Sequence, residues 1–113
     1  MSIKKPLYLP YRITTDTLEK IAFSFELSDK TQSPTAVQQL LSKILVNITE
    51  ELKLKKISNG DIIQSICMTL AVRLKMINAK ESISKEIAIE AIEKAFQGFN
   101  SAVKDNSTSK LQH

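Results

Sequence analysis

The chain has 113 residues, of which 42% are apolar and 25% charged, a composition typical of one soluble globular domain. Its formal net charge of +4 favours an anionic partner such as nucleic acid. The only cysteine, Cys67, excludes an intramolecular disulfide and favours a reducing cytoplasm, and the only histidine, His113, excludes histidine-based catalysis.

Residues 6–14 read PLYLPYRIT and alternate with the period of a β-strand. Leu9, Tyr11 and Ile13 fall on one side of this pattern. Tyr8 and Arg12 fall on the other, together with Pro10, which lacks a backbone N–H and therefore restricts such a strand to an edge or a two-stranded ribbon. Alternatively, the segment is an extended cover packed on the chain's own helices.

Residues 16–27 follow a helical pattern. Asp16 and Glu19 have the spacing of a capping box, in which the aspartate caps the first turn and the glutamate reaches back. The apolar residues recur at i, i+3, i+4 and i+7, which would place them on one buried face: Leu18, Ile21, Ala22 and Phe25. The pattern predicts a first helix over 16–27, followed by a polar loop.

A second helix is predicted over 34–56. Ser33 is a good N-cap residue, and Pro34 suits the first helical position, where its missing N–H has no partner to lose. Apolar residues then keep helical period for four turns: Val37, Leu40, Leu41, Ile44, Leu45, Ile48 and Leu52. The basic run LKLKK at 52–56 complements a helix C-terminus.

Two further helices are predicted over 59–78 and 84–103. Ser58 and Asp61 have capping-box spacing at the start of the first of these. That helix is apolar around most of its circumference, which indicates contact with several neighbours or a second subunit. Residues 104–113 are polar and unpatterned, as in a disordered tail. The sequence thus predicts a mainly α, compact four-helix domain over 1–103, with an extended segment or short strand at its N-terminus.

The order of strand, helix, polar loop and serine-capped helix resembles the ribbon–helix–helix DNA-binding family over residues 7–50. The residues that carry the resemblance are Leu9 to Ile13, 16–27, and SPTAVQQLL at 33–41. In that family two chains pair their strands into a ribbon that enters the major groove. The resemblance implies that Tyr8 and Arg12 face bases, with Ser33 and Thr35 at a phosphate.

In size, helicity and charge the chain is also similar to the small helical subunits of CRISPR effector complexes, which contact nucleic-acid backbone. In such a protein, cations along the helices and the N-terminus would provide the contacts: Lys4, Lys5, Lys53, Lys55, Lys56, Arg73 and Lys75.

No glycine-rich phosphate loop, metal-ligand spacing or long apolar run occurs, so we expect no cofactor, metal, small-molecule substrate or membrane. The expected function is that of a non-catalytic nucleic-acid-binding protein, either a ribbon–helix–helix regulator acting as a dimer or a subunit of a nucleoprotein assembly. The alternative is a helical oligomerisation or protein-interaction module that binds no nucleic acid.

Overall fold

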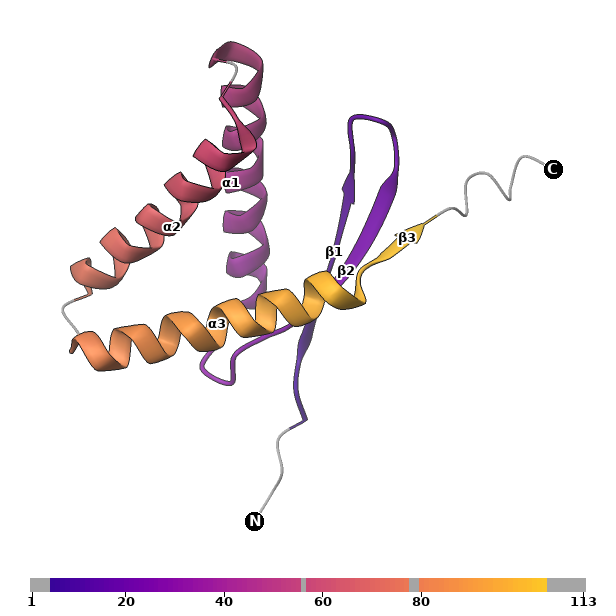
Figure 1. Ribbon diagram of the computed structural model, residues 1–113. Helices are drawn as coiled ribbons and strands as arrows, with labels where there is room; N and C mark the ends of the chain where they lie inside the picture. Colours follow the sequence, from indigo (N-terminus) through magenta and orange to yellow (C-terminus); the bar gives the residue numbers. More distant parts are fainter. Residues whose placement is uncertain (1–4, 56, 78–79, 106–113) are drawn as a thin grey trace. The chain divides into compact units, whose positions relative to one another are not determined.

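The computed structural model describes residues 5–55, 57–77 and 80–105. Figure 1 shows its elements in chain order: β1 (Tyr8–Thr14), β2 (Lys20–Glu26), α1 (Pro34–Lys55), α2 (Asn59–Met76), α3 (Glu81–Ser101) and β3 (Val103–Asp105). The described residues are mainly helical, as predicted. The predicted four-helix domain is wrong, however, because three helices and a three-stranded antiparallel sheet take its place.

The chain divides into two compact units. The sheet unit comprises Met1–Pro34 and Ala91–His113, and therefore holds all three strands and the C-terminal part of α3. The helical unit, Thr35–Glu90, holds α1, α2 and the first part of α3. Within the residues that the structure describes, no helix combines the length and apolar character needed to cross a membrane.

The N-terminal segment is a strand, and it pairs with its own chain. β1 and β2 form an antiparallel hairpin in which Leu9 lies opposite Phe25, Tyr11 opposite Phe23, and Ile13 opposite Ile21. Because side chains alternate between the faces of a sheet, these six residues share one face. Leu9 is the one buried apolar residue among those described, so this face carries the core of the sheet unit.

The helix predicted over 16–27 is wrong, because this segment forms a turn and then β2. Thr15 organises the turn: its N–H donates to the Glu19 carbonyl at 2.8 Å, and its Oγ1 accepts from the Glu19 N–H at 3.0 Å. In β2, Ile21, Phe23 and Phe25 also alternate with period two, and pairing with β1 selects that period. The segment that the ribbon–helix–helix resemblance assigned to a first helix is therefore a strand.

Pro10 lies on an edge strand, as its missing N–H required. The sheet order is β1-β2-β3, which leaves one side of β1 unpaired. Leu27 N–H donates to the Leu7 carbonyl, and Thr15 N–H to the Glu19 carbonyl, so the odd-numbered positions of β1 bond to β2. Pro10 is therefore at an outward-bonding position, where it interrupts any strand that would add to this edge.

Leu18 in the hairpin turn has a backbone φ of 64°, in the left-handed region that bulky residues disfavour. Its side chain is 80% exposed, so no packing compensates for this conformation. Replacing Leu18 with asparagine, which tolerates this region, should stabilise the chain by about 0.5–1 kcal/mol in denaturant unfolding. Leu18→Ala is the control, because it removes the side chain but keeps the Cβ; equal stability of the two variants would contradict the prediction.

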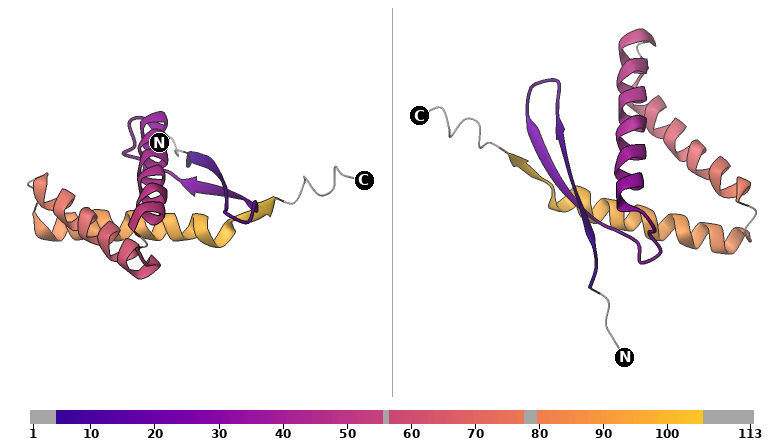
Figure 2. Two further views of the ribbon diagram at one scale, coloured as in Figure 1. Left: turned by 90° about the horizontal axis from the view of Figure 1, so that it is seen from above. Right: turned by 180° about the vertical axis from the view of Figure 1, so that it is seen from behind.

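The three later helices form close to where they were predicted. Ser58 caps α2, accepting a hydrogen bond from the Asp61 N–H at 3.1 Å, as its spacing indicated. α3 begins at Glu81, three residues earlier than predicted, and ends at Ser101. Figure 2 shows α3 leading directly into β3, which pairs with β2 and includes Lys104 and Asp105 from the predicted tail. The rest of that tail, 106–113, lies outside the described residues.

Candidate interaction surfaces

The C-terminal part of α3 lies beside β2 where β3 stops. β3 pairs with residues 20–22 of β2, and further along β2 the helix α3 approaches Phe25 and Glu26. A Cβ added to Gly98 would lie 2.3 Å from Cδ1 of Phe25, so only glycine permits this approach of the helix to the ring. The Phe25 ring is in turn stacked on Phe23, with centroids 5.3 Å apart. The C-terminal part of α3 thus packs on the aromatic side chains near the end of β2.

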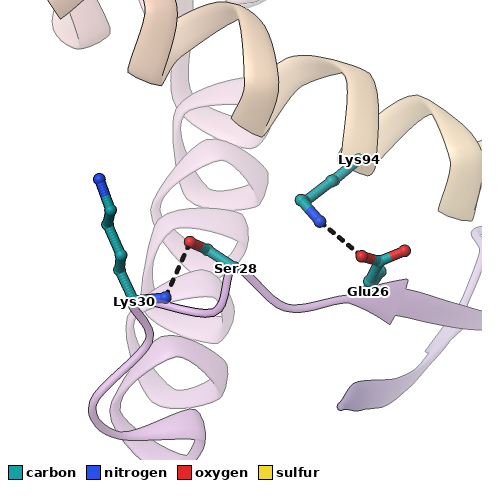
Figure 3. A network of polar contacts seen from close by, with 4 residues as sticks. All are labelled: Glu26, Ser28, Lys30 and Lys94. Atoms are coloured by element: carbon teal, nitrogen blue, oxygen red, sulfur yellow. Dashed lines mark hydrogen bonds and ion pairs between the residues drawn. The ribbon is translucent and has the colours of Figure 1, made fainter. Parts of the chain in front are cut away.

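One turn earlier in α3, Lys94 forms an ion pair with the last residue of β2 (Figure 3). Its Nζ lies 2.5 Å from Oε2 of Glu26, and the two side chains are only 23% and 26% exposed. The chain then turns at Ser28, whose Oγ accepts from the Lys30 N–H at 3.1 Å. A second ion pair, Lys104 with Glu19 at 3.0 Å, joins β3 to the hairpin turn but is more exposed, at 62% and 46%.

Because the two ion pairs differ in exposure, we expect them to contribute differently to the free energy of unfolding. Glu26→Gln should lower the free energy of unfolding by about 1–2 kcal/mol, because it removes the carboxylate charge that faces a shielded ammonium group. Glu19→Gln is the matched control and should cost no more than about 0.5 kcal/mol, since water screens that pair. Urea unfolding of both variants provides the measurement, and equal costs would contradict the assignment of Glu26 to the packing of α3.

The structure brings two of the predicted nucleic-acid contacts, Tyr8 and Arg12, onto one face of the sheet unit. Both lie on the side of β1 opposite to Leu9, and both are exposed. Lys5 precedes the strand and is exposed too, whereas Lys4 lies outside the described residues. This face therefore presents an aromatic ring and a guanidinium group in a single chain, without a ribbon made by two chains.

The other predicted contacts are divided between the two units. Ser33, in the sheet unit, directly precedes α1, and Thr35 is exposed in its first turn within the helical unit. Among the predicted cations near the helix ends, Lys53 in α1 and Arg73 and Lys75 in α2 are exposed. Lys55 ends α1, and Lys56 lies outside the described residues.

The helical unit has an exposed apolar surface that is not among the predicted nucleic-acid contacts. None of the residues of α2 is buried. Its large apolar side chains are between 48% and 67% exposed at Ile63, Ile66, Met68, Val72 and Met76. The signal for this surface was the wide apolar arc of the helix, which already indicated several neighbours or a second subunit.

α1 carries a comparable surface. Its apolar side contains Leu41 and Ile48, which are half-buried, and residues that are between 37% and 43% exposed: Val37, Ile44, Leu45 and Leu52. Among the described residues no two helices pack along one another. Both helices of the hairpin α1–α2 therefore present an apolar side that the chain itself covers only in part.

The described part of the chain contains no group of three His, Cys, Asp or Glu side chains that could hold a metal ion. Two surfaces of the described residues are candidates for interaction: the face of the sheet unit that carries Tyr8 and Arg12, and the apolar sides of α1 and α2. In comparisons with protein-family models, curated proteins and solved structures, the chain matches none.

Proposed function

We propose that this chain is a non-catalytic assembly module, whose helices complete their hydrophobic core with another polypeptide. The observation that carries the proposal is that α2 buries none of its 18 residues although it is rich in Ile, Leu, Met and Val. In proteins most of the stability of a helix comes from tertiary packing of its apolar face, which α2 lacks within its own chain. α2 therefore requires a partner to be a lasting part of the fold.

The exposed apolar surface is large enough to drive association. Twelve large apolar side chains of α1 and α2 are more than a third exposed: Val37, Leu40, Ile44, Leu45, Val46, Leu52, Leu54, Ile63, Ile66, Met68, Val72 and Met76. Their mean exposure is about one half, so burying what remains would contribute about 10–20 kcal/mol. Association costs roughly 4–15 kcal/mol, so burial of these side chains offsets it.

Hydrogen exchange of the α2 amides tests this function. In the dilute, isolated chain, these amides should exchange within a few orders of magnitude of the rate of an unfolded peptide, because little packing opposes opening. Raising the concentration or adding the partner should slow their exchange. Strong protection of α2 in a chain that is shown to be monomeric would contradict the proposal.

A second candidate function, nucleic-acid binding, is favoured by the face of the sheet unit that carries Tyr8 and Arg12. Arginine binds phosphate or guanine through two parallel hydrogen bonds, and an exposed tyrosine offers a ring on which a base can stack. The net charge of +4 supports an anionic ligand. This function needs no pairing of strands between two chains, and it is compatible with an assembly module.

Arg12→Ala should weaken the binding of a fluorescent oligonucleotide about five- to tenfold at low salt, and the remaining affinity should fall as salt rises. The matched control is Lys53→Ala, which removes one exposed cation from α1 instead. A larger effect of Lys53→Ala would assign the nucleic-acid contacts to the helices, as expected for a subunit that binds nucleic-acid backbone. The absence of binding to duplex DNA, single-stranded DNA and RNA would remove this function altogether.

A further inference from the structure

We infer that the polypeptide that covers α1 and α2 is a second copy of this chain, and that two helical hairpins form one intermolecular four-helix bundle. The inference rests on the assembly function proposed above and names its partner. Its evidence is the pattern of the two apolar seams, the length of the two helices and the area that the seams leave exposed.

Each helix carries one continuous seam, defined by residues that lie within a narrow arc of the helix. The seam of α1 consists of Val37, Leu41, Ile44, Leu45, Ile48 and Leu52, and the seam of α2 of Ile63, Ile66, Leu70 and Leu74. In both, seam residues recur three or four positions apart, which is the pattern of helices that pack at a small crossing angle in bundles. No charged residue interrupts either seam.

The connection between the helices favours a hairpin. α1 ends at Lys55 and α2 begins at Asn59, and a connection this short allows consecutive helices to come together as antiparallel neighbours in a bundle, although within the described residues of a single copy they do not pack along one another. With 22 and 18 residues, the two helices have lengths of roughly 33 and 27 Å. One hairpin offers two seams to a partner, and an identical hairpin supplies seams of the same lengths, which closes a bundle with two-fold symmetry.

The exposed area agrees with what a dimer needs. A large aliphatic side chain buries roughly 60–120 Å², so the ten seam residues leave roughly 250–500 Å² of apolar surface uncovered per copy. A standard interface buries about 800 Å² per partner, of which roughly 450–520 Å² is apolar. The seams alone thus account for about half or more of the apolar area of an ordinary dimer, before flanking residues such as Leu40 are counted.

Sedimentation equilibrium of the full chain tests the inference with the variant Ile66→Glu. Ile66 is 48% exposed in one copy, so in a monomer its replacement would be a surface change with little effect. In the proposed dimer the glutamate enters the seam, and the dissociation constant should rise at least roughly 100-fold. The control Gln64→Glu adds the same charge two residues earlier, about 200° around the helix. It should leave the dissociation constant within about threefold of the wild-type value.

Ile66→Met keeps the apolar volume and should retain the dimer, which separates loss of the seam from loss of the fold. A dimer that tolerates Ile66→Glu would overturn the assigned interface. If the wild-type chain is monomeric at all concentrations and its α2 amides are unprotected, the inference of a dimer is wrong. The proposed assembly function would then require a different protein as the partner. A wild-type monomer with α2 amides protected would overturn both the inference and the assembly function on which it rests.

Discussion

Replacing Gly98 with alanine should destabilise the sheet unit by about 2–3 kcal/mol, although the same replacement inside an exposed helix normally stabilises by about 1 kcal/mol. The added Cβ would lie 2.3 Å from Cδ1 and 2.7 Å from Cε1 of Phe25. The ring cannot turn away freely, because it is stacked on Phe23 in the same strand. The helix must therefore move off the sheet, which also strains the ion pair of Lys94 with Glu26.

This prediction is specific, because the expected change in stability is opposite in sign to that of an ordinary glycine-to-alanine replacement in a helix. Asn100→Ala is the matched control, since it gains helix propensity at an exposed position of α3, two residues away. A second change, Phe25→Leu, removes the ring and should make Gly98→Ala much less costly, which a double-mutant cycle measures by urea unfolding. Stabilisation by Gly98→Ala in the wild-type background would show that α3 does not approach β2 in this way.

Replacing Ile44 with aspartate in the seam of α1 should abolish both dimerisation and the cooperative thermal unfolding of the helices. Ile44 is 43% exposed in a single copy, where such a change would cost little. In the dimer it would bury a carboxylate among aliphatic side chains, at a cost of more than about 3 kcal/mol. Association and helix stability should therefore be lost together.

Gln39→Asp is the control for Ile44→Asp, because Gln39 lies on the opposite side of the same helix. It adds the same charge and should leave the melting temperature within about 2 °C. Circular dichroism during heating and light scattering of the same samples give the two readouts. If Ile44→Asp and Gln39→Asp behave alike, α1 contributes no seam to an interface.

Three helices and one strand could be predicted from the sequence because their signals are local. Ser33 with Pro34 marks the start of α1, and Ser58 with Asp61 marks the start of α2, where the predicted cap is present. The alternation in PLYLPYRIT favoured either a strand with Leu9 on its apolar side or an extended cover on the helices, and the structure has the strand, with Leu9 buried. Pro10 was a reason to expect an edge strand, and β1 is one.

The prediction failed where local and non-local signals compete. The capping-box spacing of Asp16 and Glu19 is a local signal for a helix, whereas the strand β2 exists through its pairing with β1. A local pattern cannot reveal that pairing, and the helical spacing of the apolar residues over 16–27 therefore predicted a helix. β3 is still less predictable, because its three residues are strand only by virtue of lying beside β2.

For the surfaces, too, local patterns could be predicted and features that depend on non-local pairing could not. The wide apolar arc of α2 predicted a shared interface, and its exposed side chains stand where that arc placed them. Gly98 gave no signal, because its importance depends on Phe25 belonging to a strand, whereas the pattern of residues 16–27 predicts a helix. Tyr8 and Arg12 were predicted to share a face, which the strand confirms, while their ligand remains a proposal.

The dependence of α1 and α2 on a second copy is tested by far-UV circular dichroism of the wild-type chain on dilution from micromolar to low nanomolar concentration, with the mass measured in parallel by mass photometry or sedimentation. If α1 and α2 obtain their stability from a second copy, the helical signal should fall in one transition that coincides with dissociation of the dimer. A helical signal that stays constant while the protein is monomeric would contradict the account.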